Sequence, residues 1–186
     1  MTYPPHFDEL LAETAAINFS MASDTDAGHL LMTLAGAKPG GSFLELGTGT
    51  GLSTAWLLAG MDESSTLVSI DNDSSLLAVA QRALGSDSRL SLVCSDGTAW
   101  LQGSSERSYD FIFADTWAGK YENLEAALGM LKAGGLYVID DMLPQPNWPD
   151  GHAAKASALL SQLESRSDLT MTFLAWSTGI VIATKK

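Results

Sequence analysis

Short apolar runs of strand length alternate along the chain with segments whose apolar residues recur at helical spacing. The strand-like runs are Phe43–Leu46, Thr66–Ile70, Leu90–Cys94, Asp110–Ala114, Leu136–Ile139, Leu169–Leu174 and Gly179–Thr184. Helical spacing is found over residues 52–59, 73–83, 124–131 and 150–163, with Gly134-Gly135 expected to stop the third helix and Asp150 to cap the fourth. This alternation predicts an α/β fold: a doubly wound sheet of about seven mostly parallel strands, an antiparallel edge hairpin, and helices on both faces.

The first forty residues are predicted to form two helices ahead of the first strand. Apolar residues at helical spacing lie within residues 7–11 and again within 27–34, and Asp24 or Thr25 is placed to cap the second helix. A chain of 186 residues can bury one sizeable core. We therefore expect one domain over all 186 residues, with residues 1–40 as its helical N-terminal cap.

Residues 43–52, FLELGTGTGL, place a strand, a glycine-rich turn and a helix start within ten residues. Gly47 and Gly49 suit a turn that approaches a ligand closely, and the amides of the following helix point back at that turn. A dinucleotide fingerprint needs G-x-G-x-x-G, whereas Leu52 stands where the third glycine should fall, so nicotinamide and flavin cofactors are disfavoured. The charge of Glu45 also disfavours a pyrophosphate and favours the ammonium group of S-adenosylmethionine. The alternative is a turn that binds no ligand.

Acidic residues fall at the ends of the predicted strands, at the edge where an open α/β sheet binds its ligands. They are Glu45, Asp71, Asp96, Asp115, Asp140 and Asp141. Asp71, with Asn72 beside it, lies 20 residues after the last glycine of the turn, the spacing at which a carboxylate meets ribose hydroxyls; alternatively it starts a tight turn. Asp96, next to Gly97, can accept from an adenine amino group or cap a helix. Trp117 can cover the adenine or pack on the surface.

The amino-acid composition limits the classes of partner that the protein is expected to bind. The chain has 22 acidic and 10 basic residues for a net charge of −12, which disfavours nucleic acid and leaves a small molecule as the expected partner. No apolar run is long enough to span a bilayer and no secretory signal is visible, so we expect no membrane partner. The lone Cys94 allows no internal disulfide and is predicted to be a buried thiol, typical of a cytoplasmic protein. The oligomeric state stays open, with a homodimer as one option.

The segment ELGTGTG over residues 45–51 resembles the first motif of the class I S-adenosylmethionine-dependent methyltransferases. ADTWAGKY at 114–121, VIDDML at 138–143 and TGIVIATKK at 178–186 are similar to the catechol and caffeoyl-CoA type of small-molecule O-methyltransferase. The resemblance covers nearly the whole chain from about Phe19 and implies a Rossmann-like fold. It also implies a cofactor site for S-adenosylmethionine formed by Met21, Ala22, Ser23, Glu45, Gly47, Thr48, Gly49, Ser53, Asp71, Asn72, Asp96, Gly97, Asp115 and Trp117.

The same resemblance implies a divalent cation, Mg, Mn or Ca, held by Asp115, Asp140 and Asp141. The chain departs from the family pattern in two places. The pair Asp140-Asp141 is Asp-Asp where the family usually has Asp-Asn, and Ala118 stands where the family often has a lysine that acts as the base. The candidate catalytic residues are Asp115, Lys120 and His152. A histidine is well matched to proton removal near neutral pH when that lysine is absent.

Our leading hypothesis is a methyltransferase that moves the methyl group of S-adenosylmethionine to an oxygen of a small acceptor, with or without a metal ion. The acceptor is expected beside the loop of residues 143–152, where Asn147, Trp148 and His152 offer a stacking face and polar groups. The alternatives are a metal-independent methyltransferase that acts on another acceptor atom and a non-catalytic protein that binds S-adenosylmethionine. A nicotinamide oxidoreductase is disfavoured by the glycine spacing.

Overall fold

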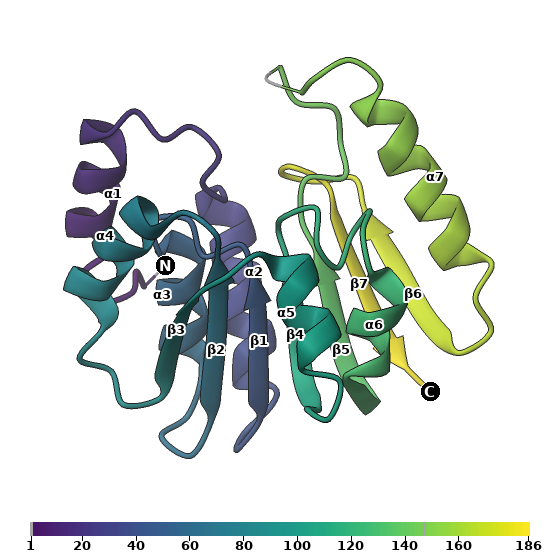
Figure 1. Cartoon of the computed structure of the whole chain (residues 1–186), viewed down its shortest axis with the longest axis horizontal. Helices are drawn as coiled ribbons and strands as arrows, with labels where there is room; N and C mark the ends of the chain where they lie inside the picture. The colour runs from purple at the N-terminus through teal and green to yellow at the C-terminus, as the bar shows by residue number, and fades with distance from the viewer. Residues whose placement is uncertain (1, 147) are drawn as a thin grey trace.

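The computed structural model describes residues 2–146 and 148–186, and in this part of the chain a seven-stranded sheet has the order β3-β2-β1-β4-β5-β7-β6. The strands are β1 (Ser42–Leu46), β2 (Thr66–Asp71), β3 (Leu90–Cys94), β4 (Tyr109–Ala114), β5 (Leu131–Ile139), β6 (Leu169–Leu174) and β7 (Ile180–Lys185). Strands β1 to β5 are parallel, whereas β7 pairs antiparallel with both β5 and β6. The predicted fold class, including the antiparallel edge hairpin, is confirmed (Figure 1).

Helices pack on both faces of this sheet. They are α1 (Phe7–Ala16), α2 (Thr25–Gly36), α3 (Leu52–Gly60), α4 (Ser74–Leu84), α5 (Gly97–Gly103), α6 (Leu124–Gly129) and α7 (His152–Glu164). One buried cluster joins α1 to α4 to the sheet and includes Trp56, while the other joins α5 to α7 and includes Leu128. Successive strand residues alternate between the clusters, with Phe43 in the first and Leu44 in the second, as the pleat of a strand requires.

Aspartates begin three of the helices. The carboxylate of Asp24 accepts from the amide of Ala27 at 2.8 Å and caps α2, and Asp73 caps α4. Asp96 accepts from the amide of Ala99 at 2.8 Å and caps α5, a helix that the sequence pattern did not predict. The alternative role that we considered for Asp96, as a helix cap, is therefore confirmed.

Two predicted boundaries are wrong. The third predicted helix ends at Gly129 instead of continuing to the glycine pair, and Leu131 already belongs to β5, where it pairs with Tyr109. Gly134 has a φ of 74° and lies where the register between β4 and β5 shifts, so the glycines belong to an irregular strand. Asp150 does not cap α7, because that helix starts at His152 after Gly151 at a φ of 83°.

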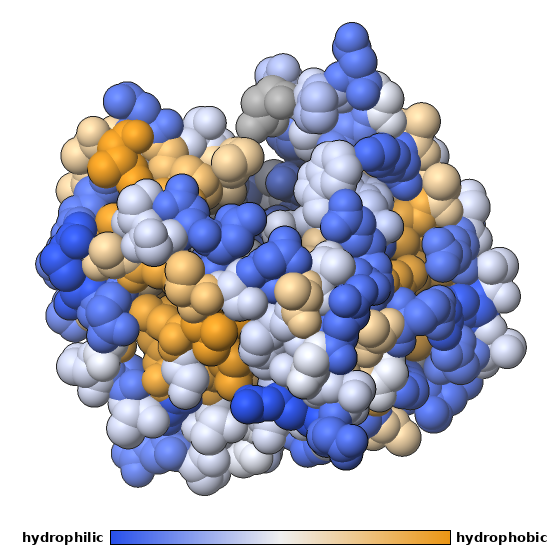
Figure 2. All heavy atoms as spheres, in the orientation of Figure 1, coloured by the Kyte–Doolittle hydropathy of each residue, from blue (hydrophilic) through white to orange (hydrophobic). Residues whose placement is uncertain are grey.

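The prediction that Cys94 is buried is also wrong. Cys94 ends β3, an edge strand of the sheet, and its side chain is exposed. Figure 2 shows apolar atoms on the left of the molecule, over β2 and β3, where Figure 1 shows little helical cover in front of the sheet. None of the helices in the described part of the chain is both long and apolar enough to span a membrane.

Candidate active site

The glycine-rich turn between β1 and α3 is held tightly against its neighbours. Gly47 has a φ of 102° and Gly49 one of 53°, backbone conformations that glycine adopts at low cost. A Cβ atom on Gly47 would lie 2.9 Å from the backbone oxygen of Asp115. The amide of Gly47 also donates to the carbonyl of Ile70 at 2.9 Å, so the turn is fixed between the ends of β2 and β4.

A cavity of about 370 Å³ opens beside this turn, at the carboxyl ends of the strands. The predicted site residues that line it are Met21, Ala22, Ser23, Gly47, Thr48, Gly49, Ser53, Asp71, Asn72, Asp115, Trp117, Lys120, Asp141 and His152. Asp96 and Gly97 line an adjoining cavity of about 340 Å³, which shares Asp71 and Trp117 with the first. The structure thus brings the predicted residues together from seven segments of the chain, and their contacts with a cofactor stay predictions.

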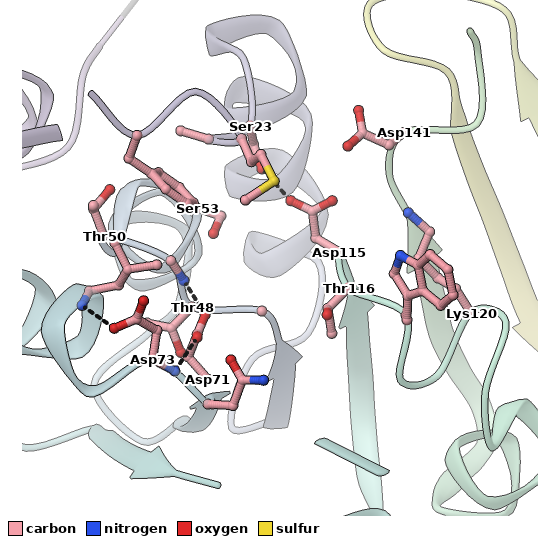
Figure 3. Close-up of a pocket in the computed structure, with 18 of the residues that line it drawn as sticks. Ser23, Thr48, Thr50, Ser53, Asp71, Asp73, Asp115, Thr116, Lys120 and Asp141 are labelled. Carbon is pink, nitrogen blue, oxygen red and sulfur yellow. Dashed lines mark hydrogen bonds between the residues drawn. The ribbon is translucent and has the colours of Figure 1, made fainter. Parts of the chain in front are cut away.

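Asp71 connects the glycine turn to the end of β2. One of its carboxylate oxygens accepts from the amide of Gly49 at 2.8 Å, and the other accepts from the amide of Asp73 at 2.9 Å (Figure 3). Each carboxylate oxygen can accept a second hydrogen bond, so the group retains the capacity to bind ligand hydroxyls. Its position at the cavity wall is the one expected from the sequence spacing.

Asp115 follows β4 directly and is covered by the segment before α2. The hydroxyl of Ser23 donates to its carboxylate at 3.0 Å. Burial, followed by the neighbouring Asp140 carboxylate, raises the pKa of Asp115 well above its usual range, and the charge of Lys120 opposes this. Figure 3 shows the carboxylate of Asp115 between Ser23 on one side and the segment of Lys120 and Asp141 on the other.

The expected metal site at Asp115, Asp140 and Asp141 is not assembled. The carboxylate of Asp140 accepts from the Thr178 hydroxyl and from the amide of Asp141 at 2.7 Å, and it does not line the cavity. In the described residues, no three Asp, Glu, His or Cys side chains are placed to share a metal ion. The donor set therefore does not fit the divalent cation that the resemblance implied, because one oxygen of Asp140 is bound to Thr178 and to the amide of Asp141, and Asp140 lies outside the cavity lining.

Lys120 provides a positive charge at this position instead. It is buried, and its ammonium group donates to the backbone oxygen of Asp140 at 2.7 Å. The charge of Lys120 lowers the pKa values of Asp115 and Asp141, which burial raises. Although Lys120 stands two positions beyond the family's lysine position, its side chain lines the cavity.

Glu45 does not fit its predicted role in the cofactor site. It lies near the end of β1, is completely buried, and is not among the residues that line the cavity. One oxygen accepts from the hydroxyls of Thr54 and Ser69, each at 2.5 Å, and the other has no hydrogen-bond partner among the described residues. Burial raises the pKa of Glu45 to about 7. The carboxylate is therefore held by Thr54 and Ser69 next to the glycine turn, and its predicted contact with a cofactor stays a prediction.

Aromatic side chains surround the far end of the cavity. His152 is buried at the start of α7, its ring lies 4.3 Å from that of Trp148, and its Nε2 lies 3.1 Å from the hydroxyl of Tyr121. Trp117 is 42% exposed, and the ammonium of Lys155 lies 3.9 Å from the centre of its ring. The predicted acceptor residue Asn147 lies outside the described residues.

Sequence reasoning missed several residues of the lining, including Phe19, Thr116 and Tyr121. Phe19 packs close to Gly49, where a Cβ atom would meet its ring at 3.2 Å. Tyr121 stands in the ADTWAGKY segment, so its proximity to the predicted site was visible in the sequence. Its partner His152 is 31 residues away, and no local pattern could join the two.

Residues 44–142, more than half of the chain, match the family model described as "Methyltransferase domain". The chain belongs to this family. A Mycobacterium ulcerans protein named "Putative O-methyltransferase" is 31% identical over 134 residues, which cover 69% of this chain and 60% of the relative. This methyltransferase domain therefore spans about 60% of the length of that curated relative.

Solved structures show the same fold. The O-methyltransferase from Bacillus cereus, in complex with SAH, has a TM-score of 0.86 at 21% identity and covers 100% of this chain and 93% of its own. The O-methyltransferase TomG from Streptomyces achromogenes, in complex with SAM, has a TM-score of 0.84 at 21% identity, covering 100% and 91%. These likenesses confirm the Rossmann-like methyltransferase fold.

The family match covers only some of the residues that line the cavity of this methyltransferase domain. Residues 44–142 contain the glycine turn, Asp71 and the loop from Asp115 to Tyr121. His152, at the aromatic end, lies beyond the matched region. The match therefore includes the glycine turn and, at the aromatic end, Trp117 and Tyr121, whereas Ser23 and Trp148 lie outside it.

Proposed function

We propose that this chain transfers the methyl group of S-adenosylmethionine to an oxygen atom of a small-molecule acceptor. The observation that carries the proposal is the charge of the cavity beside the glycine turn. Among the described residues, four carboxylates line the cavity, those of Asp71, Asp73, Asp115 and Asp141, and Lys120 is the one lysine or arginine there. Such a surface suits a donor that carries a sulfonium and an ammonium group and has no phosphate.

The donor would occupy the half of the cavity beside the glycine turn. Asp71 would accept from the ribose hydroxyls, and Asp96 with Gly97 in the adjoining cavity would bind the adenine. Asp115 and Ser23 would hold the ammonium end of the molecule. The bound donor supplies an activated methyl group, so this chain's main contribution is to position the two reactants in line and to exclude water.

The acceptor would lie at the aromatic end, between Trp117, Trp148 and His152. Because the expected metal ligands do not come together, no step of this proposal uses a metal ion. The negative net charge supports a small molecule over a nucleic acid. We further propose that the protein acts in the cytoplasm, where the exposed thiol of Cys94 would stay reduced.

Calorimetric titration with S-adenosylmethionine, S-adenosylhomocysteine and NAD tests the donor site. We expect the first two to bind and NAD not to bind. Asp71→Ala should lower affinity about ten- to a hundredfold, because hydrogen bonds to a charged group contribute about 1.5–3 kcal/mol. The exposed Asp8, in the first turn of α1, gives a matched control, and Asp8→Ala should bind as the wild type does. Equal affinities of the Asp71 and Asp8 variants would contradict the assignment.

A non-catalytic protein that binds the donor is the second candidate, because Ala118 offers no base where the family often has a lysine. Incubation with S-adenosylmethionine and a panel of hydroxylated aromatic compounds separates the two. Mass spectrometry should detect a gain of one methyl group in an acceptor. Binding of the donor without methylation of any compound would favour the second candidate.

A further inference from the structure

Tyr121 and His152 form a hydrogen-bonded pair in the wall of the cavity, at its aromatic end. The Tyr121 hydroxyl lies 3.1 Å from Nε2 of His152, and their rings meet edge to face at 89° with centres 5.2 Å apart. The two residues come from different segments, the loop after β4 and the first turn of α7. Both line the cavity, so a molecule bound at its aromatic end would meet this pair.

The turn that carries Tyr121 is rigid. The amide of Tyr121 donates to the backbone oxygen of Trp117 at 2.9 Å, and the amide of Gly119 donates to the backbone oxygen of Glu122 at 2.7 Å. The buried hydroxyl of Tyr137 donates to the carbonyl of Gly119 at 2.6 Å and ties the turn to β5. A catalytic group has to be held in position, and these bonds fix the backbone that carries Tyr121.

The second member of the pair, His152, also lines the cavity. Its ring is buried against Trp148, and among the described residues its Nδ1 has no hydrogen-bond partner. Burial, followed by the charge of Lys120, lowers the pKa of His152 below its usual range, with Lys155 adding to the effect and Asp141 opposing it. At neutral pH the imidazole is therefore uncharged and able to accept a proton.

Two other titratable groups of the cavity, Lys120 and Asp115, are less available for proton removal. The ammonium of Lys120 already donates to the backbone oxygen of Asp140, and Asp115 is bound by Ser23 at the end of the cavity assigned to the donor. The pair of Tyr121 and His152 combines a hydroxyl at the cavity wall with a neutral base directly behind it.

We propose that Tyr121 is a catalytic residue that takes the proton of the acceptor hydroxyl, and that His152 is the positioning residue that receives the tyrosine's own proton. The proposal rests on the function proposed above. As the acceptor oxygen bonds to the methyl carbon, the carbon–sulfur bond breaks and its electron pair stays on sulfur. The acceptor proton moves to the oxygen of Tyr121, and the phenolic proton of Tyr121 moves to Nε2 of His152. The imidazolium then releases that proton to water.

Kinetics of Tyr121→Phe and His152→Gln test this relay on an acceptor from the panel. Each variant should lower kcat by about a hundredfold, the scale of a lost general base, while KM for the acceptor and affinity for S-adenosylhomocysteine stay within about threefold of the wild type. Exposed residues provide matched controls, and Tyr3→Phe and His6→Gln should retain wild-type kcat. A wild-type kcat in Tyr121→Phe, or a loss confined to KM, would overturn the proposal.

The pH profile adds a signature that a purely structural role would not give. Wild-type kcat should fall as pH is lowered through the pKa of His152, because a protonated imidazole cannot accept a second proton. His152→Gln should lack this acidic limb. Persistence of the limb in that variant would assign it to another group and overturn the relay.

A second measurement needs no acceptor. The chain has three histidines, so the imidazole signal of His152 can be assigned in NMR spectra of the complex with S-adenosylhomocysteine by its loss in His152→Gln. Tyr121→Phe should change the pKa of His152, and Tyr3→Phe should not. An unchanged pKa in Tyr121→Phe would overturn the pairing. If the wild type binds S-adenosylhomocysteine but methylates no compound, the relay is overturned and the assignment of the donor site is retained. If the wild type does not bind S-adenosylhomocysteine, the proposed function is overturned.

Discussion

Replacing Glu45 by glutamine should stabilise the protein at alkaline pH and have much less effect at acidic pH. Glu45 is completely buried in β1, where one carboxylate oxygen accepts from Thr54 and Ser69 and the other has no partner. Burial is the largest cause of its raised pKa, and nearby hydroxyls oppose it. Glutamine has nearly the same shape and keeps an oxygen for the two hydroxyls, but it cannot ionise.

The sign follows from proton linkage. The pKa of Glu45 rises from 4.5 to about 7 on folding, so between these values the folded protein binds a proton that the unfolded chain has lost. The stability that Glu45 contributes is fully present below about pH 4.5 and is lost as pH rises through about 7. At about 1.36 kcal/mol for each pKa unit, the total loss is about 3 kcal/mol.

Urea unfolding of the wild type and Glu45→Gln at pH 5 and pH 8 measures this loss. The free energy of unfolding of the variant, relative to the wild type, should rise by about 2.5 kcal/mol between the two pH values. Other buried carboxylates titrate in both proteins and cancel in this difference. Glu106 is exposed, and Glu106→Gln as a control should show no such change. An equal pH dependence of the Glu45 variant and the wild type would refute the reasoning.

Three further results are expected. Gly47→Ala should abolish binding of S-adenosylhomocysteine in calorimetry, because a Cβ atom would lie 2.9 Å from the Asp115 backbone in a conformation with a φ of 102°; retained binding would show that the turn can move. Gly28→Ala should lower the free energy of unfolding in urea by about 1–3 kcal/mol, since its Cβ atom would overlap the ring of Trp56. The Cβ atom of Gly129→Ala would meet no atom within 4 Å, so this control variant should not destabilise the protein in the same titration. A chelator followed by magnesium should leave the melting temperature of the S-adenosylhomocysteine complex unchanged, because the described carboxylates form no metal site; a rise with magnesium would contradict this geometry.

The elements that follow from local pattern were predictable from the sequence. The glycine turn, the strand before it and the helix after it are defined within ten residues, and the capping role of Asp73 needs only its own helix. Residues at strand ends could be gathered at one edge of the sheet because parallel strands share that edge. The cavity lined by Asp71, Asp115 and Asp141 follows from this rule.

The predictions that failed depend on neighbours that are distant in the sequence. The exposure of Cys94 follows from the edge position of β3, which strand order sets. Glu45 looked available at a strand tip, but α3 and β2 cover it with Thr54 and Ser69. The sequence suggested Asp140 as a metal ligand, but in the structure its carboxylate accepts a hydrogen bond from Thr178, in the turn before β7. Side-chain direction at a strand end is decided by such contacts and not by residue type alone.

The position of β7 has a consequence for how the protein reaches its native state. β7 is the last strand in sequence order but lies inside the sheet, between β5 and β6, with Val138 opposite Ile182 and Phe173 opposite Val181. Until β7 is in place, both of its neighbours have open hydrogen-bonding edges, which can recruit strands of other chains. During synthesis on the ribosome, these edges therefore stay open until β7 has been made and has paired with β5 and β6. The chain is exposed to aggregation while the edges are open.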